Sequence, residues 1–181
     1  MKKFIGYYEN IVSHDLCDKI IYYCNNVKEL KKSEYANHKG NVDNSDERVK
    51  MDDGTFRDGE QYYNEIKDCF MSALSKYCER HRDVSCQRHT DFRLNKYSEG
   101  GFMSRHIDNI HHSHGQTYGF PQLTSLLMLN DNYEGGDFIV ADNDFKTKKG
   151  SAIVFPSNFM FPHAVTKIEK GTRYSIVTWL M

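Results

Sequence analysis

Hydrophobic and polar positions follow two different patterns along this chain. In the first ninety residues, apolar residues recur every three or four positions, which is the spacing of one helix face. This pattern predicts a helix from about His14 to Val27, with Ser13 as its N-cap, and a second from Glu60 to about Arg80. The predicted buried stripes are Leu16, Ile20, Tyr23, Cys24 and Val27 in the first helix, and Tyr62, Tyr63, Ile66, Phe70, Leu74 and Tyr77 in the second.

After residue 90 the pattern changes to short apolar runs. Such runs lie at 122–130, 135–142, 151–157 and 173–180, and Gly, Asn, Asp and Pro separate them. No helical pattern lies between them, so they predict an antiparallel β-sandwich or barrel. The expected fold class is therefore β-rich α+β, with two N-terminal helices beside a β-structured body.

Residues 28–60 fit neither pattern, because they are mostly polar or charged and include three glycines. We expect a surface loop here, with one short strand near Val49–Met51. A solvated loop is the simpler interpretation, and a lid over a site is the sharper alternative.

Composition narrows the possible partners. The chain has 181 residues, 24 of them basic and 25 acidic, with a formal net charge of −1. This balance gives no support for nucleic-acid or membrane-surface binding. No apolar run reaches the roughly 20 residues that span a bilayer, and the N-terminus lacks the apolar region of a signal peptide. We expect a single-domain, cytoplasmic protein that is a monomer or a weak homo-oligomer.

The five cysteines are Cys17, Cys24, Cys69, Cys78 and Cys86. Their number is odd and none forms a CxxC pair, which argues against a disulfide framework or a cysteine-rich zinc site. We expect reduced thiols that pack as small apolar groups.

The segment RHIDN at 105–109 is the first candidate for chemistry. One residue separates His106 from Asp108, so on a strand the two side chains point the same way. His163 follows 55 residues after Asp108. Two imidazoles and one carboxylate can occupy one face of an octahedral Fe(II) ion and leave the other face open. HxD alone is common by chance, and the alternative is a polar turn beside a buried histidine.

Arg173 strengthens this hypothesis, because it lies ten residues beyond His163 on the last predicted strand. A guanidinium group can hold a carboxylate through two parallel hydrogen bonds. The alternative is an ion pair at the sheet edge. Alternation on this strand places Arg173, Ser175, Val177 and Trp179 on one face.

Other polar residues near the HxD pair have less certain roles. The cluster His111, His112 and His114 invites a zinc interpretation, but we expect a solvent-facing loop near the site entrance that binds metal only adventitiously. Arg105 and Asn109 are candidates for contacts with the ligands or a substrate, or are simply exposed polar residues.

Three blocks of the C-terminal half resemble one known family. They are YSEGGFMSRHIDN at 97–109, LTSLLMLNDNYEGGDFIV at 123–140, and KKGSAIVFPSNFMFPHAVTKIEKGTRYSIVTWL at 148–180. In order and spacing they resemble the Fe(II)- and 2-oxoglutarate-dependent dioxygenases, specifically the prolyl 4-hydroxylase branch. RHIDN and TRYSIVTW are most similar to the oxygen-sensing prolyl hydroxylases, and the glycine-rich blocks to the collagen-type and small microbial or viral enzymes.

The resemblance implies a double-stranded β-helix, the cupin-like jelly roll, flanked by the two helices. Residues 1–90 would give helical support and a mobile loop, with the 28–60 stretch where this family carries a substrate-covering loop. Residues 91–181 would form the jelly-roll core that holds the iron site.

The resemblance also implies residue roles. His106, Asp108 and His163 would bind Fe(II), and Arg173 would hold the distal carboxylate of 2-oxoglutarate. Tyr97 matches a tyrosine close to the co-substrate, and Trp179 a tryptophan that lines the pocket. The oxygen-sensing enzymes carry a tyrosine on the middle strand that also bonds this carboxylate. Its aligned position here is Leu127, so Ser175 or Thr124 would assist Arg173 instead.

The implied activity is hydroxylation of proline in a peptide or protein, with O₂ consumed and succinate and CO₂ released. Ascorbate would keep the iron reduced. One alternative is the same chemistry on a free amino acid, another side chain or a small metabolite. An alternative of another class is a non-catalytic metal-binding jelly roll.

Overall fold

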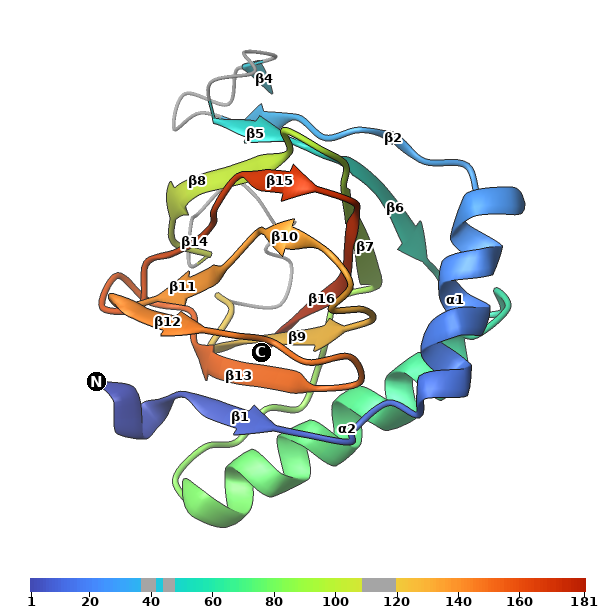
Figure 1. Ribbon diagram of the computed structural model, residues 1–181. Coiled ribbons are helices and arrows are strands. Elements are labelled where there is room, and N and C mark those ends of the chain that lie inside the picture. Colours follow the sequence, from blue (N-terminus) through green and yellow to red (C-terminus); the bar gives the residue numbers. More distant parts are fainter. Residues whose placement is uncertain (37–41, 44–47, 109–119) are drawn as a thin grey trace.

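The computed structural model describes residues 1–36, 42–43, 48–108 and 120–181. Two β-sheets lie face to face, and both long helices lie on the outer side of one of them (Figure 1). This architecture confirms the predicted β-rich α+β class and the jelly roll.

The larger sheet has seven strands and the smaller has five, and every described pairing is antiparallel. The larger sheet has the order β1 (Gly6–Tyr8), β13 (Ala152–Pro156), β9 (Leu123–Met128), β16 (Arg173–Leu180), β7 (Phe92–Tyr97), β6 (Asp52–Phe56) and β2 (Lys31–Lys32). The smaller sheet has the order β12 (Asn143–Phe145), β11 (Phe138–Val140), β14 (His163–Val165), β8 (Phe102–His106) and β5 (Val49–Lys50). Two further pairs join β10 (Glu134–Gly135) to β15 (Ile168–Lys170) and β3 (Tyr35–Ala36) to β4 (Val42–Asp43).

Both predicted helices are present, with small differences at their ends. A 3₁₀ turn, η1 (Lys2–Phe4), precedes β1. Helix α1 spans His14–Asn26, and the Ser13 hydroxyl accepts a hydrogen bond from the Leu16 amide at 3.2 Å, as a helix N-cap does. Val27 lies beyond the helix and is 65% exposed, so its predicted place in the buried stripe is wrong.

Helix α2 spans Tyr63–Arg80 and begins three residues later than predicted. Tyr62 has φ +68°, which is left-handed backbone and ends the preceding turn before the helix starts. Its ring packs edge-on against Tyr23 of α1, with ring centroids 5.5 Å apart, so Tyr62 joins the two helices.

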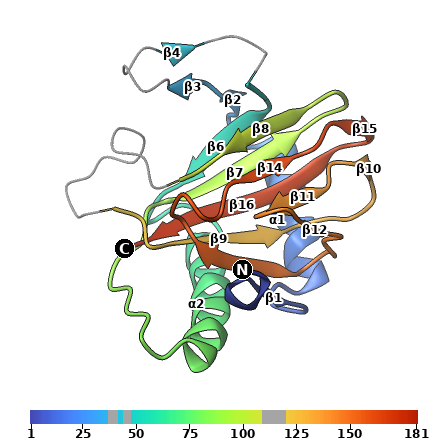
Figure 2. The same ribbon diagram turned by 90° about the vertical axis from the view of Figure 1, so that its left-hand side faces the viewer.

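Side-chain alternation along the strands of the larger sheet creates two separate cores. Leu94, Leu127 and Ile176 point outward and pack with the buried faces of α1 and α2. The neighbouring Met128 and Val177 point inward and pack between the two sheets. Figure 2 shows the same layers from the side. Polar residues on the inner faces are therefore held in an apolar, largely dry interior.

The short strand predicted near Val49–Met51 is confirmed, because residues 49–50 form the edge strand β5. The prediction of a surface loop is wrong for residues 52–56, which form strand β6 and pair along its whole length with β7. The charge in this stretch is misleading, because the Asp53 carboxylate pairs with Arg93 at 2.7 Å and is buried. Residues 37–41 and 44–47 lie outside the described part, so a lid there stays a prediction.

All five cysteines are free thiols, as predicted, and three of them are buried. Among the described residues, no helix is both long enough and apolar enough to cross a bilayer.

Candidate active site

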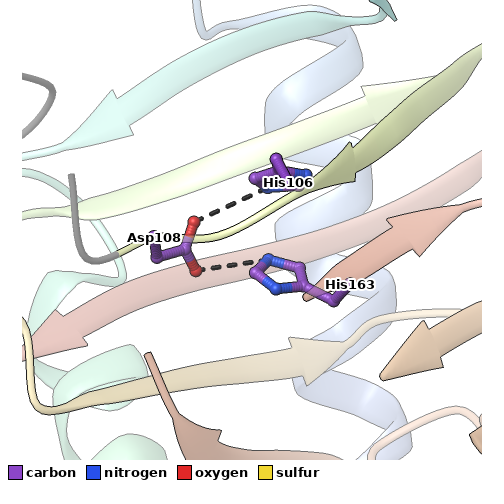
Figure 3. A group of neighbouring side chains, drawn as sticks. All are labelled: His106, Asp108 and His163. Carbon is purple, nitrogen blue, oxygen red and sulfur yellow. Dashed lines mark ion pairs between the residues drawn. The ribbon is translucent and has the colours of Figure 1, made fainter. Parts of the chain in front are cut away.

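Two side chains from strands of the smaller sheet and a third from the bend after one of these strands converge between the sheets (Figure 3). One ligand atom each from His106, Asp108 and His163 lies within 4.8 Å of the other two. Asp108 Oδ1 is 3.6 Å from His106 Nε2, and Asp108 Oδ2 is 3.2 Å from His163 Nε2. The sequence placed these residues in one group, and the structure brings them together.

The register of the smaller sheet produces this meeting. His106 is the last residue of β8 and His163 the first of β14, and the two are direct partners across the antiparallel pair. Their ring centroids are 4.2 Å apart. Asp108 does not lie on the strand, as HxD alternation suggested, but in the bend just after it. That bend turns its carboxylate back toward both imidazoles.

Backbone carbonyls fix the protonation of both histidine rings. His106 Nδ1 lies 2.8 Å from the Ser104 carbonyl oxygen, and His163 Nδ1 lies 3.2 Å from that of Phe161. A carbonyl can only accept, so each Nδ1 carries the hydrogen and donates it. The lone pair of a neutral ring is then on Nε2, the atom that faces Asp108, which is the arrangement of a metal-binding histidine.

One hydroxyl group from the opposite sheet holds the Asp108 carboxylate, and a second hydroxyl group contacts the first. Thr124 of β9 donates a 2.7 Å hydrogen bond to Asp108 Oδ2, and the Ser157 hydroxyl lies 2.9 Å from the Thr124 oxygen. Both hydroxyl-bearing residues are fully buried. This contact gives Thr124 a role at Asp108, and its predicted contact with a co-substrate stays a prediction.

The electrostatics of the cluster favour a carboxylate that stays ionised. Burial alone would raise the pKa of Asp108, but His163, His106 and the Thr124 hydrogen bond outweigh it and hold that pKa well below its ordinary value. Burial, reinforced by the charge of His163, lowers the pKa of His106 to about 4. Burial lowers the pKa of His163, but the charge of Asp108 and its hydrogen bond outweigh burial and raise that pKa. The cluster thus offers an anionic carboxylate and the neutral ring of His106, and a bound cation would compete with a proton for His163.

Arg173, the first residue of β16, lies on the inner face of the larger sheet and is 1% exposed. Its Nη1 donates to the Ser175 hydroxyl at 3.0 Å and its Nη2 to the Met128 sulfur at 3.3 Å, whereas Nε has no partner. No carboxylate in the described part of the chain lies within ion-pair distance of it. A buried cation without a counter-ion is costly, so this site is built for an anion.

Aromatic rings and a glycine surround the guanidinium group. Its carbon atom lies 5.3 Å from the ring centroid of Tyr97, the cross-strand partner of Arg173, and 5.9 Å from that of Phe138. Gly136 lies beside this side chain at φ +66°, and glycine is required there because a Cβ would collide with Ile168.

The structure also corrects the position on β9 that faces Arg173. Leu127 points outward into the core beneath the helices, so it does not stand beside the guanidinium group. Its neighbour Met128 contacts Arg173 instead. This placement could have been predicted, because Met128 lies four residues after Thr124 on the same strand and therefore shares its inward-pointing face.

The remaining predicted residues have mixed outcomes. Trp179 is 9% exposed and belongs to the core between the sheets. Arg105 points outward and forms an exposed ion pair with Asp142 at 2.8 Å. Asn109 and the histidines at 111, 112 and 114 lie outside the described residues.

Comparison with known proteins identifies the family to which this arrangement belongs. Residues 92–181 match the family model of the 2OG-Fe(II) oxygenase superfamily. The chain belongs to this superfamily. The matched segment contains all three residues of the cluster and Arg173.

Two relatives in this superfamily are hydroxylases by name. Human prolyl 3-hydroxylase 2 is 38% identical over 69 residues, which are 34% of this chain and 10% of that protein. A PKHD-type hydroxylase of Delftia acidovorans is 34% identical over 95 residues, covering 48% of this chain and 41% of that protein. The chain thus spans less than half the length of either relative.

Solved structures share the fold over nearly the whole chain. A Pseudomonas putida prolyl-4-hydroxylase has a TM-score of 0.73 at 17% identity and covers 98% of this chain and 91% of that one. A Trichoplax adhaerens prolyl hydroxylase, solved with a hypoxia inducible factor peptide fragment, has a TM-score of 0.75 at 19% identity, with coverage of 99% and 84%.

Members of the 2OG-Fe(II) oxygenase superfamily use Fe(II), 2-oxoglutarate and O₂, and the residues present here fit those groups. Two imidazole nitrogens and a carboxylate are suitable donors for Fe(II) that leave coordination positions open. The guanidinium group of Arg173, whose Nε has no hydrogen-bond partner, suits a carboxylate of 2-oxoglutarate.

Proposed function

We propose that this protein is an Fe(II)- and 2-oxoglutarate-dependent dioxygenase that hydroxylates proline in a peptide or protein and releases succinate and CO₂. His106, Asp108 and His163 hold the iron, and Arg173 binds the distal carboxylate of 2-oxoglutarate. Tyr97, Ser175, Thr124 and Trp179 shape the co-substrate pocket. Bound Fe(II) and 2-oxoglutarate together activate O₂ for insertion into a C–H bond.

The observation that carries this proposal is the buried Arg173, which has no counter-ion among the described residues. The ring of Phe138 lies 5.9 Å from its guanidinium carbon and 5.9 Å from the ring of His163, so one side chain connects Arg173 with the cluster. A jelly roll that only binds a metal needs no buried guanidinium, and removing one from water without an anion destabilises the fold. A dicarboxylate that bridges the cluster and Arg173 explains both features at once. This reasoning favours an enzyme over a non-catalytic metal-binding jelly roll.

Each residue then contributes by position and charge. The carbonyl-bound Nδ1 atoms aim the two Nε2 lone pairs, and Thr124 fixes the orientation of the Asp108 carboxylate. Ser175 and Tyr97 hold the guanidinium of Arg173 in place through a hydrogen bond and ring contact. The apolar side chains between the sheets exclude water, which strengthens every charge interaction in the pocket.

Proline as the substrate is supported by likeness to proteins named prolyl hydroxylases, one of which was solved with a peptide fragment. A free amino acid, another side chain or a small metabolite is the alternative substrate. Ascorbate, by reducing iron that has become oxidised, is proposed to sustain turnover.

An unbiased peptide library tests this function. The purified protein is incubated with Fe(II), 2-oxoglutarate, O₂ and ascorbate, and mass spectrometry follows both succinate and peptides. The proposal expects a gain of one oxygen atom on proline in a subset of peptides, with succinate released in equal amount. A panel of amino acids and small metabolites is assayed in parallel. If only members of this panel are oxidised, the oxygenase assignment stays intact and proline in a peptide is overturned as the substrate. No succinate and no iron binding would overturn both.

A further inference from the structure

The inner face of β7 carries polar groups that the proposed iron and co-substrate sites do not use. Arg93, Asn95 and Tyr97 share this face by alternation, whereas Phe92 and Leu94 point outward into the core beneath the helices. Tyr97 contacts Arg173, so Asn95 and Arg93 continue the same wall away from the proposed 2-oxoglutarate anchor.

Asn95 is the most telling of these residues, because it is 6% exposed and its Oδ1 has no hydrogen-bond partner in the described structure. Its cross-strand neighbours are Ser175 of β16 on one side and Asp53 of β6 on the other. Leaving a buried polar atom unpaired costs about 1–3 kcal/mol, so an unsatisfied amide at this position calls for an explanation. A hydrogen bond to a ligand supplies one.

Arg93 and Asp53 form a part-buried pair beside Asn95. Arg93 Nη2 donates to Asp53 Oδ2 at 2.7 Å and to the Ser33 hydroxyl at 2.6 Å. The described residues give no partner to Nε and Nη1 of Arg93 or to Oδ1 of Asp53. The Arg93–Asp53 pair is neutral overall. It nevertheless keeps N–H groups of Arg93 that can donate a hydrogen bond and an oxygen of Asp53 that can accept one.

This polar group lies on the same face of the larger sheet as residues of the proposed reaction centre. Arg93 pairs with Val177 of β16, which pairs in turn with Leu126 of β9, two residues from the Thr124 that binds Asp108. Asn95 pairs with Ser175, the residue that accepts a hydrogen bond from Arg173. A substrate held here would lie beside the cluster and still leave Arg173 to 2-oxoglutarate.

We propose that Asn95 and the Arg93–Asp53 pair form a subsite that binds a peptide amide of the substrate. The free Arg93 N–H groups donate to the amide carbonyl, and Asn95 Oδ1 or Asp53 Oδ1 accepts from the amide N–H. A neutral pair favours a neutral amide over the free carboxylate of an amino acid, because Asp53 already balances the charge of Arg93. This inference rests on the proposed oxygenase function and narrows its substrate class to a peptide chain.

The test compares Asn95→Leu and Arg93→Met with wild type. The probes are the best-oxidised library peptide with acetylated N-terminus and amidated C-terminus, and free L-proline. Losing one or two hydrogen bonds to substrate is expected to lower kcat/KM for the capped peptide about tenfold to a hundredfold. The anaerobic Fe(II)–2-oxoglutarate absorption band and the succinate released without peptide should stay within about twofold of wild type. Arg93→Lys, which keeps a charged donor, should recover part of the loss.

Lys96→Met is the matched control, because Lys96 lies on the same strand but points outward to Asn25 of α1. If Asn95→Leu does not fold by circular dichroism, Asn95→Ala takes its place. Unchanged peptide kinetics in folded variants would overturn the subsite alone. Turnover of free proline but not of the capped peptide would overturn both the subsite and the peptide substrate, and would leave the oxygenase assignment intact. A wild-type protein with neither absorption band nor succinate release would instead overturn the proposed function.

Discussion

At the scale of single residues, a few buried polar side chains distinguish this site from an ordinary sandwich core. The HxD pair, His163 and Arg173 were recognisable in the sequence, because their types and order match one kind of chemistry. The roles of Thr124 and Asn95 were not, since both depend on which side chains meet across the sheets. The predicted position of Leu127 beside the co-substrate was wrong by one residue. Adjacent residues on a strand point to opposite faces, so Leu127 faces the helices instead.

Thr124 is expected to tune iron affinity without binding iron. Thr124→Val keeps the shape of the side chain and removes the hydroxyl that donates to Asp108 at 2.7 Å. Loss of such an orienting hydrogen bond lowers metal affinity about tenfold to a hundredfold. Anaerobic titration with Fe(II) measures this change. Ser125→Ala, a change at the adjacent buried residue that points to the other face, is the control and should bind iron as wild type does. Equal affinity in both variants would contradict the role of Thr124.

At the scale of elements, apolar runs with clear periodicity were predicted well and polar edge strands were not. The strands β9, β13 and β16 are almost wholly buried on both faces, and most of their residues are apolar. β6 contains the sequence DDGTF, and its buried Asp53 is satisfied by a partner on another strand, Arg93 of β7. No local pattern reveals those partners, so the sequence indicated a loop.

The packing of α2 against the larger sheet is expected to contribute much of the stability. Phe70 is fully buried, and its ring stacks on Phe92 of β7 with centroids 5.2 Å apart. Phe70→Ala should lower the free energy of unfolding by about 3–5 kcal/mol, as core Phe→Ala substitutions do. Urea denaturation measures it. Phe159→Ala, at a position 76% exposed, should change stability by less than about 0.5 kcal/mol, and a similar loss in both variants would contradict this account of the helix layer.

At the scale of the whole molecule, two cores share one sheet, and the inner core holds the site. Sequence patterns indicated both the sandwich and the flanking helices, but the pairing of His106 with His163 is a long-range register that periodicity does not specify. The family resemblance, which rests on the order of motifs across 97–180, supplied that information.

The free energy of unfolding is expected to fall in alkaline solution, because burial keeps the Cys24 thiol and the Tyr77 hydroxyl protonated. Both groups lie in the core between the larger sheet and the helices. Burial raises the pKa of Cys24 to about 12 from 9.0, and that of Tyr77 to about 12 from 10.0. Above pH 9 the unfolded chain therefore binds fewer protons than the folded one, so unfolding becomes more favourable as pH rises. Each fully effective group contributes about 1.4 kcal/mol per pH unit.

Urea denaturation between pH 7 and pH 11 checks this dependence. The free energy of unfolding should be nearly constant up to about pH 9 and then decline, within the window set by the 9.0 and 12 values of Cys24. Cys24→Ala should decline less steeply than wild type. An identical slope in the two proteins would show that this thiol does not carry the effect.

The most direct test of the central claim is anaerobic visible spectroscopy of the protein with Fe(II) and 2-oxoglutarate. If His106, Asp108 and His163 bind the iron and Arg173 anchors the co-substrate, adding both should produce a metal-to-ligand charge-transfer band in the wild type. His106→Ala should abolish the band, Arg173→Gln should raise the 2-oxoglutarate concentration needed for it by about a hundredfold, and His112→Ala should leave it unchanged. No band in the wild type at saturating 2-oxoglutarate, or a band that survives His106→Ala, would contradict the account.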